Sequence, residues 1–274
     1  MHQARLRRHM RRRLLSFAKR YAIIEDGKVT EEAENADRTA ISVVVPCYNH
    51  SKYLPLAIQS LAKQTLPAQD IVFVNDFATD DTRDVLEAAL RSSGLSNRSH
   101  CTVLENPSNM GQAASLNRGI DVCTTDVIMV LNDDDYLFHD ALEVALGVLH
   151  QHHELALLGG RNIDFDTDAS IELYSKEILR IWNIEEIGLR LFPQEAVLRF
   201  NHQNDFNTPH SGCSFLKCAW RAVEGYCTQK RDRVVPFSDR DFQFRVNLLF
   251  PIGLLDAPVS FWRSNSSVDS GKFT

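Results

Sequence analysis

Three consecutive carboxylates, Asp133, Asp134 and Asp135, are the side chains of this sequence with the clearest capacity for chemistry. Carboxylates spaced this closely repel one another. A divalent cation such as Mg²⁺ or Mn²⁺, which prefers hard oxygen ligands, would lower that repulsion. A polar turn that only caps the next helix would need no cation, and Asp-rich turns of that kind are common. The run therefore indicates either a metal site or a solvated turn, and the elements around it must decide.

The residues directly in front of these carboxylates, 127–131, are apolar and rich in β-branched side chains. The run is too short for a typical helix and is typical of a buried strand. An α/β fold places its ligand site at the carboxyl ends of such strands. The element that positions the three carboxylates is therefore predicted to be a buried strand that ends at Asn132.

Three earlier apolar runs, at residues 41–46, 71–74 and 101–104, are predicted to be strands for the same reason. Between the strands, apolar residues recur at helical spacing. This alternation predicts an α/β fold with a largely parallel, doubly wound sheet. Asn49, Asp76 and Asp134 each follow one of the strands, so the topology brings them to one edge of the sheet. Their convergence favours the metal site over the solvated turn.

The composition is that of an ordinary globular protein, with 44% hydrophobic and 24% charged residues among 274. No apolar run approaches the roughly 20 residues that span a bilayer, and no apolar segment follows the basic start. We therefore expect neither a membrane-spanning helix nor a cleaved signal. The six cysteines form no CxxC pair, which predicts reduced thiols in a cytoplasmic protein.

Residues 1–20 carry eight basic side chains and no acidic one, which leaves the rest of the chain strongly acidic. Apolar residues interleave with the basic ones, so this tail is predicted either to form a basic amphipathic helix on an anionic membrane surface or to be a disordered or partner-bound extension. Nucleic acid is not expected as a partner, because the acidic body would repel it. Residues 25–38 are mostly acidic and polar, which is typical of a linker.

Several short motifs follow one another along the chain: residues 43–49, 64–65, 72–82, 109–111 and 131–135, together with Asn117. In this order they resemble a family 2 glycosyltransferase of the GT-A fold, over roughly residues 41–263. The resemblance implies a Rossmann-like doubly wound, mostly parallel sheet flanked by helices, with a less regular second half that binds the acceptor. It also implies a metal-dependent, inverting hexosyl or N-acetylhexosaminyl transfer from a nucleotide diphosphate donor, most often a UDP-sugar, with Mn²⁺ or Mg²⁺ as cofactor.

The implied organisation has three parts: a basic tail and acidic linker, a nucleotide-sugar-binding half, and a half that binds the acceptor and supplies the catalytic base. These parts cover residues 1–40, 41–160 and 161–274, and the last two form one GT-A domain over 41–263. The implied acceptor is a polysaccharide, a lipid-linked glycan or another cell-surface glycan. The implied location is the cytoplasm, at the inner face of the plasma membrane if the basic tail binds lipid.

The resemblance assigns the nucleotide to residues after the first two strands. Pro46, Tyr48 and Asn49 match the motif whose loop holds the base and ribose, and Tyr48 offers an aromatic face for a base. Asp76 matches the acid that accepts a hydrogen bond from uracil N3–H, a role that suits a carboxylate because it is a pure acceptor. The alternative is that Asp76 merely caps its own turn.

A second group of matches surrounds the sugar and the diphosphate. Asn109 and Gly111 match a loop beside the base, where glycine allows close approach of the backbone. Asp133 and Asp134 match the end of the DxD motif, with Asp134 as the metal ligand and Asp133 near the ribose or the water shell of the metal. Arg263 stands in the family's C-terminal stretch, where its charge suits a phosphate contact.

The catalytic base falls in the second half, where residues 237–245 resemble the pattern ED-x-D-L-x-x-R. Asp239 takes the position of the base, although an acid there could also serve only to favour the start of a helix through the macrodipole. Asp241 and Arg245 stand at i,i+4 and are predicted to form a structural ion pair.

The sequence departs from the family pattern at Asn75, Asn132 and Ser238, each of which replaces an acidic residue. These departures leave open a catalytically silent module that binds nucleotide-sugar or glycan. A sugar-phosphate nucleotidyltransferase is less favoured, because its glycine-rich first loop is absent after Val45.

Overall fold

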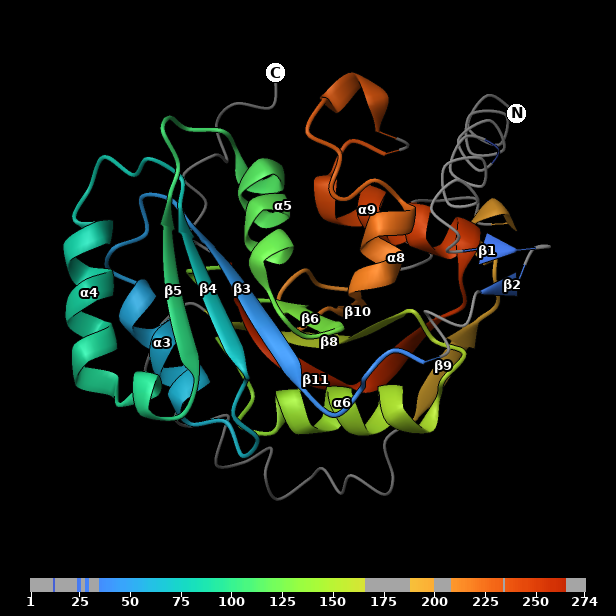
Figure 1. Ribbon diagram of the computed structural model, residues 1–274, viewed down its shortest axis with the longest axis horizontal. Helices are drawn as coiled ribbons and strands as arrows, with labels where there is room; N and C mark the ends of the chain where they lie inside the picture. Colours follow the sequence, from blue (N-terminus) through green and yellow to red (C-terminus); the bar gives the residue numbers. More distant parts are fainter. Residues whose placement is uncertain are drawn as a thin grey trace.

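The computed structural model describes residues 12, 24–25, 28–29, 35–165, 188–199, 208–233 and 235–264 (Figure 1). The predicted amphipathic helix of residues 1–20 lies outside the described residues, apart from Arg12. Two short strands, β1 (Ile24–Glu25) and β2 (Lys28–Val29), pair in an antiparallel ribbon. No helix in the described part of the chain is long and apolar enough to cross a membrane.

The four predicted strands form one side of a nine-stranded sheet with the order β5-β4-β3-β6-β10-β8-β11-β7, and β9 pairs with β11. The four are mutually parallel: β3 (Ile41–Cys47), β4 (Asp70–Asn75), β5 (His100–Glu105) and β6 (Val127–Val130). Every residue of β3, β4 and β6 is buried, which explains their nearly continuous apolar sequences. The α/β fold predicted from the sequence is thereby confirmed.

The other side of the sheet mixes directions. The three-residue strand β10 (Ser214–Leu216) lies antiparallel between β6 and β8 (Leu157–Phe165). Strand β8 runs parallel to β11 (Ile252–Arg263), whose remaining partners, β7 (Tyr136–Leu137) and β9 (Leu189–Phe192), are antiparallel. Both halves of the chain therefore contribute to one sheet.

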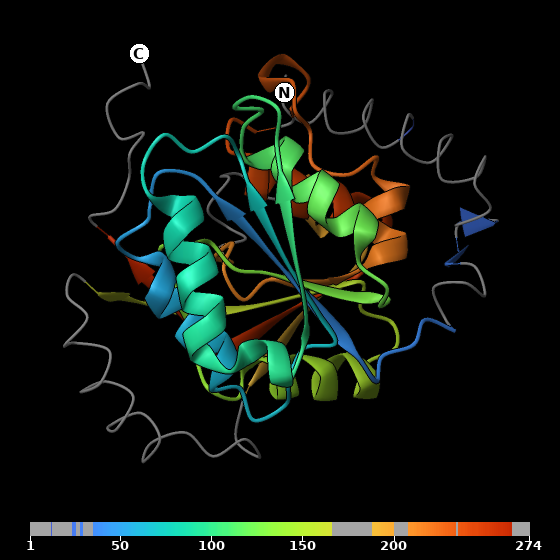
Figure 2. The same ribbon diagram turned by 60° about the vertical axis from the view of Figure 1, so that its left-hand side comes forward.

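Helices cover this sheet (Figures 1 and 2). They are α3 (Leu54–Ala62), α4 (Thr82–Ser93), α5 (Gln112–Val122), α6 (Ala141–Gln151), α8 (Lys217–Ala222) and α9 (Ser238–Leu249), with short 3-10 turns at Leu95–Asn97, Ala196–Arg199 and Lys230–Asp232. Helix α5 crosses β3 and β4 closely because Gly119 has no side chain: a Cβ there would lie 2.5 Å from Val44 Cγ1 and 3.0 Å from Val74 Cγ2. In both views α8 and α9 lie next to α5.

Arg38 fixes the start of the folded body. Its side chain is 3% exposed and donates hydrogen bonds to the carbonyl oxygens of Leu149 (2.6 Å), His152 (3.1 Å) and His153 (2.7 Å). These carbonyls lie at the C-terminal end of α6, where helix carbonyls lack intrahelical partners and favour a cation. The folded body therefore includes Arg38, although the sequence predicted a linker over residues 25–38.

All six cysteines lie among the described residues, and none of them forms a disulfide there. Cys47, Cys123, Cys213 and Cys218 are buried, and burial raises the pKa of the Cys123 thiol to about 12. These thiols act as small apolar core residues.

Asp70, at the start of β4, supplies a stability prediction. Its carboxylate accepts hydrogen bonds from the N–H (2.8 Å) and hydroxyl (2.6 Å) of Thr124 and from the Ser42 hydroxyl (3.1 Å). Burial opposes its charge, but these donors outweigh burial and lower the pKa of Asp70. The contribution to stability is therefore present above the unfolded-state pKa of 3.8 and is lost as pH falls through the folded-state pKa.

We expect Asp70→Asn to lower the free energy of unfolding at neutral pH by about 1–2 kcal/mol. The variant should also lose less stability than the wild type when the pH is lowered to about 3. Urea unfolding at both pH values measures this, with Asp232→Asn, a change at an exposed carboxylate, as the control. Equal acid sensitivity of the Asp70→Asn variant and the wild type would contradict the assignment.

Candidate active site

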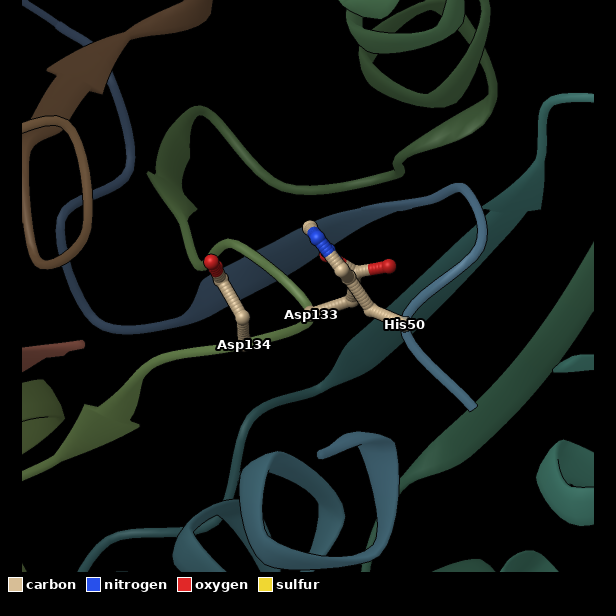
Figure 3. Close-up of side chains that lie close together, drawn as sticks. All are labelled: His50, Asp133 and Asp134. Carbon is tan, nitrogen blue, oxygen red and sulfur yellow. The ribbon is translucent and has the colours of Figure 1, made fainter. Parts of the chain in front are cut away.

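The turn after β6 carries the predicted metal ligand and joins it to a residue that the sequence did not single out. Side-chain ligand atoms of His50, Asp133 and Asp134 all lie within 4.8 Å of one another. Figure 3 shows His50 on the loop after β3 and the two carboxylates on the turn after β6. An imidazole and two carboxylates are a donor set that fits Mn²⁺ and is compatible with Mg²⁺. The residues present thus fit the divalent cation that the resemblance implies.

Asp133 is the most constrained member of this cluster. One carboxylate oxygen accepts the Tyr48 N–H (2.9 Å), and the other lies 2.8 Å from His50 Nδ1. Burial raises the pKa of the Asp133 carboxyl even though His50 and Tyr48 favour its charged form, and the charge of Asp134 raises it further. A bound cation would favour both charged carboxylates, because its own charge reverses this balance.

Asp135 ties the metal turn to two distant segments. Its carboxylate accepts hydrogen bonds from the Ser211 hydroxyl (2.6 Å), the Arg263 N–H (3.0 Å) and the Asn132 side-chain amide (3.2 Å). Burial, followed by the charge of Asp134, raises the pKa of Asp135 to about 7. Residues on β11 and in front of β10 therefore hold the turn in place.

Arg263, predicted to contact a phosphate, lies against the same turn and is 4% exposed. Its Nε donates to the carbonyl oxygen of Asp134 (3.1 Å). Its guanidinium carbon lies 4.1 Å from the ring centroid of Tyr53 and 4.4 Å from that of Phe165, in cation–π geometry. The position of Asp134 thus depends on β11 as well as on β6.

The structure brings together three of the residues assigned to the nucleotide base. Asp76 is 3% exposed and accepts hydrogen bonds from the N–H groups of Met110 and Gly111 (both 2.8 Å) and from the Asn106 side chain (2.7 Å). Asn109 in turn accepts a hydrogen bond from the Gly111 N–H (3.1 Å). Asp76 therefore shapes the loop that carries Asn109 and Gly111. A base that donates to Asp76 would share a carboxylate oxygen that already accepts a hydrogen bond from this loop.

The other residues of the first-strand motif lie nearby. Pro46 is buried within β3, whereas Tyr48 and Asn49 are half-buried on the loop that follows it. Asn49 adopts a left-handed backbone conformation (φ 54°), and its side-chain oxygen accepts the Thr79 N–H (2.8 Å). The loops after β3 and β4 are thus joined at the carboxyl edge of the sheet.

A cleft of about 820 Å³ connects this edge with the predicted catalytic base. Its lining includes Gly111, Asn132 and Asp135 together with His210 and Asp239. Asp239 is half-buried in the first turn of α9. Asp241 is buried on the same helix and pairs with Arg245 at 2.8 Å, which confirms the predicted structural ion pair. Only one of the two helix acids therefore faces the cleft.

His210 lies on the wall of this cleft next to the base. It is buried and lies 3.2 Å from the Tyr226 hydroxyl. Burial lowers the pKa of His210, and the negative charge of Asp239 partly offsets that effect. A neutral imidazole there can hydrogen-bond without adding charge.

Comparison with known proteins adds the decisive observation: residues 42–217, more than half of the chain, match the model of glycosyl transferase family 2. The chain belongs to this family. Among curated relatives, glycosyltransferase GlyG of Streptococcus pneumoniae is 26% identical over 134 residues, which is 49% of this chain and 43% of GlyG. The poly(ribitol-phosphate) beta-N-acetylglucosaminyltransferase TarS of Staphylococcus aureus is 30% identical over 119 residues, covering 43% of this chain and 20% of TarS. The chain spans less than half the length of these curated relatives.

Solved structures place this family 2 member in the GT-A fold. Residues 1–349 of S. aureus TarS in complex with UDP-GlcNAc superpose with a TM-score of 0.60 at 18% identity, covering 84% of this chain and 60% of that one. The mannosyltransferase PcManGT of Pyrobaculum calidifontis, in complex with GDP-Man and Mn²⁺, gives a TM-score of 0.56 at 13% identity, covering 95% and 68%. At these identities the likeness shows the fold alone.

Two residues of this family 2 site were missed by the sequence reasoning. His50 has no ligand spacing along the chain, because its partners lie on the turn after β6, more than 80 residues away. Its only signal was its place just beyond β3, the sheet neighbour of β6. Asp135 was visible only as the third acid of the run, and its role depends on Ser211 and Arg263, which are distant in sequence.

Proposed function

We propose that this family 2 glycosyltransferase transfers a sugar from a UDP-sugar to a hydroxyl of a cell-surface glycan or lipid-linked acceptor, with inversion at the anomeric carbon. The observation that carries the proposal is the single cleft that joins the metal turn, through Asn132 and Asp135, to the half-buried Asp239. TarS and GlyG, both glycosyltransferases by name, support the reaction class.

Asp239 is the base in this proposal. An acceptor hydroxyl is a weak nucleophile, so a carboxylate must take its proton as attack on the anomeric carbon develops. The neutral side chain of His210 lies beside this carboxylate and can orient the acceptor without competing for the proton. A single displacement needs no second carboxylate nucleophile, and the buried Asp241–Arg245 pair is not available as one.

The leaving diphosphate belongs at the turn after β6. His50, Asp133 and Asp134 would hold the divalent cation, which when bound stabilises negative charge on a departing diphosphate. Arg263 adds a fixed positive charge against the Asp134 carbonyl. Tyr48, on the neighbouring loop, offers its aromatic face to the base.

Uracil is the proposed base because Asp76 is a pure acceptor at the loop of Asn109 and Gly111. The UDP-GlcNAc complex of TarS supports this choice, whereas the GDP-Man complex of PcManGT shows that the fold also accommodates another base. The basic tail of residues 1–20 would tether the enzyme to an anionic membrane surface, where a lipid-linked acceptor would be found.

A catalytically silent binding module is the second candidate, and the hydrogen bonds of two asparagines favour it. Asn132, at the first position of DxD, uses its side chain for structural hydrogen bonds to Gln112 (3.0 Å) and Asp135 (3.2 Å). Asn75 likewise bonds Glu105 (2.8 Å). These amides hold the site together where acids occur in relatives.

Donor hydrolysis separates the two candidates. The full chain would be incubated with UDP-, GDP- and dTDP-sugars in Mn²⁺, in Mg²⁺ or in EDTA, and release of the nucleoside diphosphate measured. We expect slow, metal-dependent UDP release from a UDP-sugar. UDP binding without release, in the presence of acceptor extracts as well, would favour the silent module. Neither binding nor release would refute the proposed function.

A further inference from the structure

Trp262 is an exposed aromatic residue in a strand that is otherwise largely buried. Its side chain is 45% exposed, whereas its neighbours Phe261 and Arg263 are 0% and 4% exposed. Trp262 lines the cleft that contains Asp239, together with two further exposed apolar residues, Met110 and Phe237. Three of the seven large apolar side chains exposed among the described residues therefore gather in one cleft, and such clustering marks a binding surface.

The neighbouring strand places polar groups beside this indole. Strands β8 and β11 are parallel, with Asn162 opposite Ser260 and Asp164 opposite Trp262. Directly paired residues share a face of the sheet, and all four line the cleft. The contact between the Asn162 amide and the Asp164 carboxylate is 3.5 Å, at the limit of a hydrogen bond, so both groups retain capacity for a ligand.

A flat indole next to a carboxylate and an amide suits a pyranose ring. The C–H groups on one face of the ring carry slight positive charge and pack against the electron-rich face of an aromatic side chain. The equatorial hydroxyls then point sideways, where a carboxylate accepts their protons and an amide both donates and accepts. A lipid chain would not use the polar groups, and a phosphate would be repelled by Asp164.

We propose that Trp262, Asn162 and Asp164 form a subsite that binds a sugar ring of the acceptor, so that the acceptor is a saccharide. The inference rests on the proposed function, because it takes the Asp239 side of the cleft as the place where the acceptor hydroxyl is activated. Trp262 directly precedes Arg263, which holds the Asp134 carbonyl, so the platform and the metal turn are fixed by the same strand. An acceptor stacked there lies in the same cleft as the base.

The test compares Trp262→Ala and Trp262→Phe with wild type and with Leu191→Ala, an exposed apolar residue of β9 that does not line the cleft. Donor hydrolysis without acceptor is measured first, and Leu191→Ala should leave it unchanged. Transfer is then measured to a panel of saccharides. The panel contains the methyl glycosides of glucose, N-acetylglucosamine, galactose and glucuronate, and the β-1,4-linked tetrasaccharides of glucose and of N-acetylglucosamine. We expect the acceptor KM to rise about 3- to 10-fold in Trp262→Ala and less in Trp262→Phe, which keeps an aromatic face.

Indole fluorescence gives a readout that does not depend on turnover. The chain has three tryptophans, so the signal lost in Trp262→Phe isolates residue 262. Quenching by a saccharide of the panel in wild type but not in Trp262→Phe supports the subsite, even if donor hydrolysis fails and the proposed function falls. The subsite is overturned if no saccharide of the panel quenches the fluorescence, or if Trp262→Ala leaves the acceptor KM unchanged. A raised donor KM in hydrolysis would also overturn it, because Trp262 would then lie at the donor sugar.

Discussion

Replacing Asp239 with asparagine is expected to lower kcat for sugar transfer by about 10²- to 10⁴-fold. Asparagine keeps the shape and hydrogen-bonding reach of the side chain but cannot accept the proton of the acceptor hydroxyl at neutral pH. Because the change lies on the α9 side of the cleft, UDP binding at the loops after β3 and β4 should persist. Transfer kinetics, together with calorimetric titration of UDP in the presence of Mn²⁺, measure the two effects separately.

Two further variants control this result. Asp232→Asn removes an exposed carboxylate from the 3-10 turn that precedes α9 and should leave transfer unchanged. Asp241→Asn breaks a buried pair with Arg245, so it should cost about 3–5 kcal/mol of stability through the guanidinium left without its partner. An Asp239→Asn enzyme that transfers sugar at the wild-type rate would mean that Asp239 serves only the start of α9.

Three strands of the first half were predictable because each is buried on both faces. A parallel strand buried on both faces is mostly apolar, so β3, β4 and β6 appear in the sequence as nearly continuous apolar runs. Parallel strands also share one carboxyl edge, which is why the convergence of Asn49, Asp76 and Asp134 followed from topology. Edge strand β5 gave a weaker signal, since half of it faces solvent.

The second half carried no comparable pattern. Strand β10 has three residues, too few for any periodicity, and its antiparallel insertion depends on pairing with β6 and β8 across the fold. Such pairing is decided by tertiary contacts that a single sequence does not display. The same limit applies to Trp262, because an exposed and a buried tryptophan look identical in sequence.

The structural contacts of Asp76 and Arg263 also could not be predicted from the sequence. Asp76 was assigned to a base, but the N–H groups of Met110 and Gly111 that it accepts have no sequence signature. Arg263 was assigned to a phosphate, and its stacking between Tyr53 and Phe165 could not be foreseen from residues so far apart. Sequence identifies which side chains can do chemistry, whereas packing decides which of them also hold the site together.

Replacing Asp134 with alanine is expected to abolish metal-dependent UDP release and also the stabilisation of the protein by Mn²⁺. A cation that binds only the folded state stabilises it by about 2.7 kcal/mol at a hundred times its dissociation constant. His50 and Asp133 already bond each other at 2.8 Å, so without Asp134 they offer the ion a weaker site. Thermal unfolding with and without Mn²⁺, and after addition of EDTA, measures the loss, with Asp232→Asn as the control.

The unfolding temperature of Asp134→Ala without metal gives the sharper result. Most substitutions lower the unfolding temperature, whereas this one is expected not to lower it. The charge of Asp134 raises the pKa values of both Asp133 and Asp135. Between pH 3.8 and about 7, unfolding lets Asp135 ionise while the folded protein keeps it protonated, so stability falls as pH rises through that range. Removing Asp134 relieves part of this cost, so metal-free Asp134→Ala should unfold at neutral pH at a temperature no lower than that of metal-free wild type. A lower unfolding temperature in EDTA would instead mean that Asp134 supports the fold, whereas stabilisation by Mn²⁺ that persisted in the variant would contradict the metal site of His50, Asp133 and Asp134.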